Sequence, residues 1–133
     1  MQIVDANIIL RYLLSDHEEL SVKAEEIIDN NSIYLPIEVI CEVVYVLNKV
    51  YNVSRSDISD ELISFIRELD VTVPSQESVL AGLKNFGVEN IDFVDCILAG
   101  YAEADGAQIH TFDRKLRKLI DNLATLKQAD NED

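Results

Sequence analysis

The chain has no long hydrophobic run. In a sequence of 133 residues, no stretch without a charged residue exceeds eight residues. A helix that spans a membrane needs about 20 mostly apolar residues, so the sequence excludes one. The first residues carry neither a basic segment nor a long apolar segment, so we do not expect a secretory signal. These absences predict a cytoplasmic protein.

Cysteine, proline and glycine are also scarce, at two, two and four residues. Cys41 and Cys96 lie far apart in apolar segments and lack metal-ligand spacing, which favours buried reduced thiols over a disulfide. No linker and no internal repeat divides the chain, whose length is that of one ordinary domain. We therefore expect a single domain at residues 1–122 and a polar, frayed tail at 123–133.

Basic residues are few, because 25 acidic residues stand against 11 basic ones and the formal net charge is −14. This balance argues against a protein that wraps a nucleic-acid backbone. His17 and His110 have no partner at the spacing of zinc ligands, so we interpret both as surface or structural residues. Most of the acidic residues fit the solvated faces of helices.

The hydrophobic pattern predicts strands that alternate with helices. We expect strands at 2–4, 33–35, 71–73 and 108–111. We expect helices at 7–14, 21–29, from Pro36 through 50, 54–69, 75–85, 93–104 and 114–120, with a loop through Gly87 and a C-terminal cap at Gly106. This alternation implies a parallel sheet with helices on both faces, an α/β fold in which ligands bind beyond the carboxyl ends of the strands.

Several acidic residues occupy positions that a solvated surface does not explain. Asp5 follows the first strand, where it either caps the next helix or binds a cation. Glu42 lies at the border of an apolar helix stripe and either reaches solvent or faces a site. Asp92, Asp95 and Asp113 stand at the starts of helices, where carboxylates also serve as caps, and Asp92 fits that role best.

Taken together, these carboxylates point to a hard cation. Asp5, Asp113 and the start of the Glu42 helix belong to one edge of the expected sheet, and Asp95 begins another helix. Carboxylates that converge at such an edge repel one another unless a cation neutralises them. Oxygen ligands select Mg²⁺ or Mn²⁺ rather than zinc.

Four motifs follow one another along the chain. They read DANIILRYL at 5–13, EVVYVL at 42–47, DFVDCILA at 92–99 and TFDRKL at 111–116. In this order and at these separations the sequence resembles the PIN-domain ribonucleases, and within them the VapC-type toxins of toxin–antitoxin pairs. The resemblance covers nearly the whole chain and implies a parallel-sheet α/β/α sandwich of PIN-domain type.

The resemblance also implies a site and an activity. It assigns metal binding and catalysis to Asp5, Glu42, Asp95 and Asp113, with Asn7 and Thr111 orienting these acids or a metal-bound water and Asp92 as an additional acid. The implied reaction is the hydrolysis of RNA phosphodiester bonds with one or two Mg²⁺ or Mn²⁺ ions.

Partners follow from the same resemblance. They are an RNA substrate, a cognate antitoxin and a second copy of the chain in a homodimer. An acidic body suits a basic peptide partner. Local basic groups for RNA are expected from Arg11 and from the segment with Arg114, Lys115, Arg117 and Lys118, which also fits a solvated helix face.

Other interpretations remain open at this stage. A catalytically silent PIN-like binding module would share all the motifs. A receiver-like domain would need an aspartate after a central strand, whereas the strand at 33–35 ends in Pro36. A phosphatase of the haloacid-dehalogenase type would need Asp-x-Asp, whereas the chain has Asp5-Ala6-Asn7.

Overall fold

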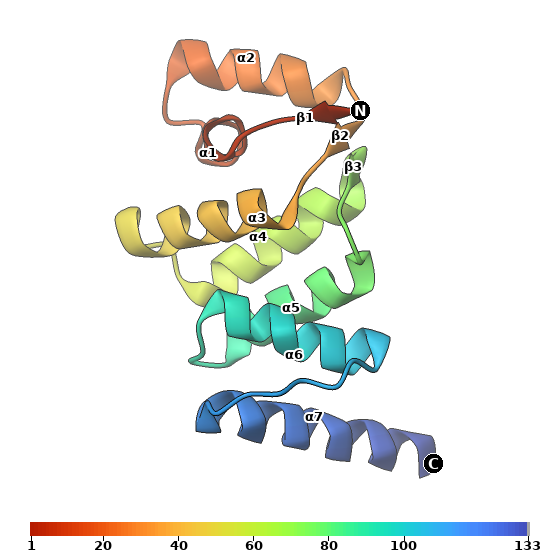
Figure 1. The fold of residues 1–133 in the computed structure, drawn as a ribbon. Coiled ribbons are helices and arrows are strands. Elements are labelled where there is room, and N and C mark those ends of the chain that lie inside the picture. Colours follow the sequence, from red (N-terminus) through yellow and green to blue (C-terminus); the bar gives the residue numbers. More distant parts are fainter. Residues whose placement is uncertain (133) are drawn as a thin grey trace.

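The computed structural model describes residues 1–132 and shows short strands between longer helices (Figure 1). The elements are β1 (Gln2–Ile3), α1 (Ala6–Leu14), α2 (Glu18–Asp29), β2 (Ile33–Tyr34), α3 (Ile37–Tyr45), the π-helical segment η1 (Val46–Val50), α4 (Arg55–Glu68), β3 (Val71–Thr72), α5 (Gln76–Val88), α6 (Phe93–Asp105) and α7 (Arg114–Glu132). None of the helices in this part of the chain is long and apolar enough to cross a membrane.

The described strands form one parallel sheet in the order β1-β2-β3. Gln2 pairs with Ile33, and Ile33 pairs in turn with Val71. A parallel connection needs a crossover, and here α1 and α2 join β1 to β2, while α3, η1 and α4 join β2 to β3. The predicted α/β fold with a parallel sheet is therefore confirmed.

The strand expected at 108–111 is wrong for this structure. The segment between α6 and α7 pairs with no strand in residues 1–132, and Phe112 is fully exposed. Other bonds hold the segment, because Ala107 N donates to Tyr101 O at 3.1 Å and the Arg117 guanidinium donates to Ile109 O. A short segment becomes a strand only where a sheet edge accepts its hydrogen bonds.

Local signals place several helix ends correctly. Asp57 N donates to Ser54 Oγ at 3.1 Å, which caps α4 as predicted. Gly106 ends α6 with φ of 68°, the left-handed conformation that favours glycine. His17 has the structural role expected of it, because its Nδ1 accepts from Leu20 N at 3.1 Å and caps α2.

Two predicted helix ends are wrong. The helix α5 continues through Gly87 to Val88, where a loop was expected. The last helix, α7, extends to Glu132 rather than ending near residue 120, so residues 123–132 are helical instead of frayed. A domain boundary at residue 122 stays a prediction, and Asp133 lies outside the described residues.

Two separate clusters of buried side chains hold the molecule together. The larger cluster joins the sheet to α1 through α6, and Ile9, Ile33, Ile58 and Leu83 are among its fully buried members. The smaller cluster consists of Ala99, Leu116 and Leu119 and joins α7 to α6. As a result, α7 lies at the opposite end of the molecule from the N-terminus (Figure 1).

Candidate active site

Asp5 lies directly after β1 at the entry to α1. Its Oδ1 accepts a hydrogen bond from Ile8 N at 3.1 Å, so Asp5 does cap the helix. The residue is exposed, as is Asn7 in the first turn of α1. A capping carboxylate uses only part of its acceptor capacity, so the cap and a metal-binding role are compatible.

Glu42 lies on α3, which packs against both α1 and α6. Val43 and Val44 next to it are buried in the core, whereas Glu42 is exposed. The carboxylate therefore stands on the solvent side of the apolar stripe, where an ion or a substrate can reach it.

Asp92 and Asp95 begin α6. Asp92 occupies the N-cap position without a side-chain capping bond. Asp95 is half-buried, and its pKa is raised first by burial and then by the negative charges of Asp113 and Asp92. Both effects disfavour the ionised carboxyl. We call Asp92, Asp95 and Asp113 the acidic cluster, because Asp95 senses the charges of the other two.

Asp113 precedes α7 and also acts as a cap. Leu116 N donates to Asp113 Oδ1 at 2.8 Å, and Asp113 N donates to Thr111 Oγ1 at 3.0 Å. Thr111 thus holds the backbone that carries Asp113, and its role in orienting the acids or a metal-bound water stays a prediction. Asp113 reaches the cluster because α7 packs against α6.

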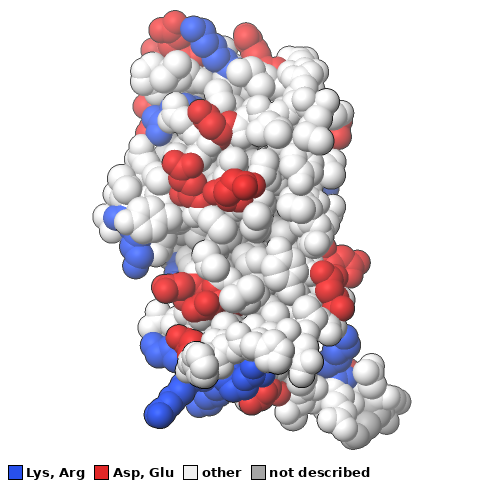
Figure 2. All heavy atoms as spheres, viewed as in Figure 1, with Lys and Arg blue, Asp and Glu red and all other residues white. Residues whose placement is uncertain are grey.

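The four predicted ligands do not surround one point in this arrangement of side chains. Within residues 1–132, no three Asp, Glu, His or Cys side chains lie close enough together to hold a metal ion. Figure 2 shows acidic side chains in separate groups, over α1 and α3 and again beside the start of α6. The chemistry of these oxygen donors fits Mg²⁺ or Mn²⁺, but the described geometry is not a closed ligand set.

The basic side chains near the site differ in whether they are free to contact RNA. Arg11 is already hydrogen-bonded within the protein, because it donates to Asp16 Oδ1 at 2.7 Å and to the Tyr51 hydroxyl at 2.9 Å. Arg114, Lys115 and Lys118 are exposed in the first turns of α7, where Figure 2 shows a blue patch. The exposed basic residues of α7, which follow Asp113 directly, are therefore available to RNA. Arg11 is not, because its guanidinium is already hydrogen-bonded within the protein.

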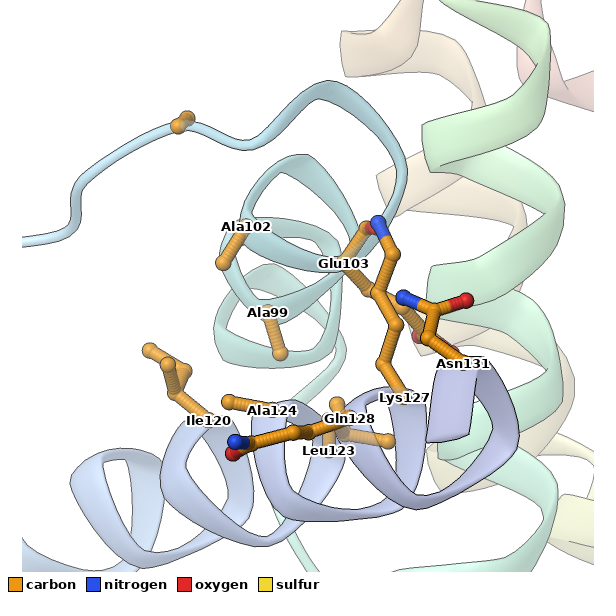
Figure 3. Close-up of a pocket in the computed structure, with 10 residues that line it drawn as sticks. Ala99, Ala102, Glu103, Ile120, Leu123, Ala124, Lys127, Gln128 and Asn131 are labelled. Carbon is orange, nitrogen blue, oxygen red and sulfur yellow. The ribbon is translucent and has the colours of Figure 1, made fainter. Parts of the chain in front are cut away.

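Two cavities lie on either side of α6. The one in Figure 3, of about 570 Å³, lies between α6 and α7 and is lined by Ala99, Ala102, Ile120 and Leu123 among others. It contains none of the predicted ligands. The other, of about 360 Å³, lies between the α3–η1 segment and α6, and both Asp92 and Asp95 line it. We call this second one the α3–α6 cavity.

The PIN domain family profile matches residues 3–121. The chain belongs to the PIN domain family. A curated relative, the VapC ribonuclease of Aquifex aeolicus (strain VF5), is 25% identical over 130 residues, which cover 90% of this chain and 92% of the relative. No solved structure matches the chain.

Family membership decides between the fold-level alternatives. A PIN domain is neither a receiver domain nor a haloacid-dehalogenase-type phosphatase, so these two alternatives are excluded. The resemblance read from the four motifs is confirmed by the match over residues 3–121.

Sequence reasoning missed the residues of this PIN domain that line the α3–α6 cavity without being acidic. Tyr45, Asn48, Lys49 and Arg55 belong to this group. Their only sequence signal is a set of polar and aromatic residues at the end of an apolar stripe. A solvated helix end produces the same pattern, so the cavity becomes visible only when α3 packs against α6.

Proposed function

We propose that this PIN domain is a metal-dependent endoribonuclease and the toxin of a toxin–antitoxin pair. The observation that carries the proposal is the carboxyl of Asp95, half-buried and close enough to Asp113 and Asp92 for their charges to raise its pKa. Such a cluster is costly without a cation. Similarity to a VapC ribonuclease supports RNA as the substrate.

Asp5, Glu42, Asp95 and Asp113 would hold the ion, which we propose is Mg²⁺ or Mn²⁺. A bound ion of this kind lowers the pKa of a coordinated water and stabilises negative charge on the phosphate. Because no three of these groups are assembled within residues 1–132, we expect ion binding to reorganise their side chains.

The remaining residues of the site would position these acids. Thr111 accepts from the backbone N–H of Asp113 at 3.0 Å and so holds the start of α7 in place. Asn7 lies in the first turn of α1, two residues after Asp5. Asp92 adds negative charge next to Asp95, which strengthens the demand for a cation.

The partners in this proposal are RNA, a cognate antitoxin and a second copy of the chain, all in the cytoplasm. A body with a net charge of −14 attracts a basic antitoxin segment over a long range at low salt. RNA approach would depend on the bound cation and on exposed basic residues such as those of α7, because the net charge of the protein repels phosphate.

Activity of the purified protein tests the proposal. Freed of any partner, it should cleave end-labelled single-stranded RNA with Mn²⁺ or Mg²⁺ and stop when EDTA is added. Asp5→Asn and Asp95→Asn should each lower the rate by about 100-fold or more, because a metal site contributes several kcal/mol to the transition state. Asp60→Asn, an exposed acid on α4, is the matched control and should cleave normally.

Ion binding provides a second measurement on the same proteins. Mn²⁺ should raise the melting temperature of the wild-type protein, because a ligand that binds only the folded state stabilises it. This increase should be absent in Asp5→Asn and Asp95→Asn. Unchanged cleavage in both variants, with circular dichroism showing them folded, would contradict the assignment.

One observation favours a catalytically silent binding module as the second candidate, namely that no assembled metal-ligand group exists within the described residues. Such a module should release no metal-dependent products from a panel of structured and unstructured RNAs. It should also show no change in melting temperature with Mn²⁺.

A further inference from the structure

The α3–α6 cavity adjoins the acidic cluster, and nothing described so far assigns a function to it. Its volume of about 360 Å³ falls in the range of small-molecule sites, about 300–1,000 Å³. Asp92 and Asp95 form part of its lining, so anything bound there lies next to the proposed catalytic acids. The remaining lining residues are Cys41, Val44, Tyr45, Asn48, Lys49, Arg55, Phe86, Phe93 and Val94.

Aromatic and aliphatic groups form most of this cavity. Phe86 and Phe93 are buried and pack edge to face, with ring centroids 5.6 Å apart. Tyr45 and Val94 remain 63% and 57% exposed, although both line the cavity. An exposed tyrosine beside an apolar hollow is the kind of surface on which an unpaired base stacks.

Two cationic side chains line the same cavity as Tyr45. Arg55 is fixed, because its guanidinium lies 3.8 Å from the centroid of the Phe86 ring and its Nε donates to Phe86 O at 2.9 Å. Lys49 is exposed on η1 and also lines the cavity. The net charge of the protein is −14, so these two positive charges make this cavity wall more favourable for a phosphate beside Asp92 and Asp95 than most of the surface.

The backbone at this wall is also unusual. Val46–Val50 forms a π-helical turn immediately after α3, and such turns inside helices occur frequently at functional sites. Asn48 Nδ2 donates to Val53 O at 3.1 Å, which holds the turn in place. The wider turn sets the positions of Asn48 and Lys49 relative to Tyr45 on the preceding helix.

We propose that the α3–α6 cavity binds one unpaired nucleobase of the RNA next to the phosphodiester that is cleaved. Tyr45 stacks on the base and Lys49 contacts the adjoining phosphate. Because Asp92 and Asp95 also line the cavity, a base bound there brings the reacting phosphate beside the acidic cluster. The proposal rests on the ribonuclease function and adds to it the site that selects a single-stranded substrate.

RNA containing single abasic positions tests this site. With wild-type protein, an abasic nucleotide at one position beside the mapped cut should raise KM about tenfold, the effect of losing one stacked base. Tyr45→Ala should raise KM by the same factor on intact RNA and should show no further loss on the abasic RNA. Tyr45→Phe keeps the ring and should behave like the wild-type protein.

Salt dependence separates the role of Lys49 from that of Tyr45. Lys49→Ala should weaken RNA binding and reduce the slope of log affinity against log salt by about 0.7, as expected for one lost phosphate contact on a single strand. Lys84→Ala and Val88→Ala change exposed residues on α5 and serve as matched controls with wild-type affinity. Circular dichroism checks that every variant is folded.

Binding measured in EDTA distinguishes failure of this site from failure of the ribonuclease proposal. Fluorescence anisotropy with labelled single-stranded RNA needs no cleavage, so Tyr45→Ala and Lys49→Ala should weaken binding even if turnover is absent. Equal affinity of both variants and the wild-type protein, with equal tolerance of abasic RNA, would overturn the proposal. Loss of antitoxin binding with unchanged RNA affinity would assign the cavity to a protein partner and also overturn it.

Discussion

Asp95 carries a carboxyl whose pKa lies above its usual range, because burial and the charges of Asp113 and Asp92 disfavour the ionised form. These influences disappear when the chain unfolds. A raised folded pKa contributes stability that is fully present below the unfolded pKa and is lost as the pH rises through the folded pKa. At neutral pH the ionised Asp95 therefore destabilises the metal-free fold.

Replacing this carboxyl by a neutral amide should remove the cost. We expect Asp95→Asn to stabilise the metal-free protein at pH 7 by less than about 1 kcal/mol, because the side chain is only half-buried. The difference should vanish as the pH falls below the unfolded pKa of about 3.9, where both side chains are neutral. Thermal melts in EDTA between pH 7 and pH 3 measure it, and a pH-independent difference would contradict the explanation.

Helices α5 and α6 approach each other through small residues. A Cβ added at Gly100 would meet the backbone oxygen of Ser78 well inside van der Waals contact, and one at Gly82 would lie 2.7 Å from Ile97 Cδ1. Because the atom that blocks Gly100 is backbone, it cannot rotate away. This close packing holds the middle of α6 against α5 and so fixes the helix that carries Asp95.

Gly100→Ala should therefore destabilise the protein by about 2–3 kcal/mol, the cost of overpacking, even though alanine favours a helix. Gly106→Ala is the contrasting variant, because a Cβ there meets nothing within 4 Å. Its φ of 68° alone should cost about 1 kcal/mol. Urea unfolding measures both changes, and a neutral Gly100→Ala would show that α5 and α6 are farther apart.

At the scale of the whole molecule, α7 is held by a cluster distinct from the main core. Among the described residues, only Ala99, Leu116 and Leu119 are buried in this cluster, whereas the larger cluster joins the sheet to α1 through α6. Small clusters open at lower free energy than large ones. Asp113 caps α7, so the attachment of this helix also determines where one of the proposed metal ligands lies.

Leu116→Ala should release α7 without unfolding the remainder. A buried leucine contributes about 2–5 kcal/mol, which is large relative to a cluster of this size. Hydrogen exchange should show faster exchange of α7 amides while those of α1 through α4 stay protected. Leu126→Ala, an exposed position on α7, should leave both regions unchanged. Uniform loss of protection in Leu116→Ala would show that the molecule has a single cooperative core.

Much of the architecture was predictable because it depends on local signals. The segment at 33–35 is typical of a strand because Ile-Tyr-Leu stands before Pro36, and Ser54 and Gly106 mark helix ends by their own chemistry. The segment at 108–111 was also expected to be a strand, yet it forms none, because pairing depends on a free sheet edge elsewhere in the molecule. The π-helical turn at Val46–Val50 likewise has no local signal that separates it from an α-helix.

By itself, the sequence determined the family and the candidate metal ligands, since acids at Asp5, Glu42, Asp95 and Asp113 stand inside four ordered motifs. Only the tertiary structure decided which of them share an environment. Asp95 interacts with Asp113 because α7 packs on α6, and Tyr45 and Lys49 border the same cavity as Asp95 because α3 packs on α6. Electrostatic and stacking energies depend on distance through space, and spacing along the chain does not specify that distance.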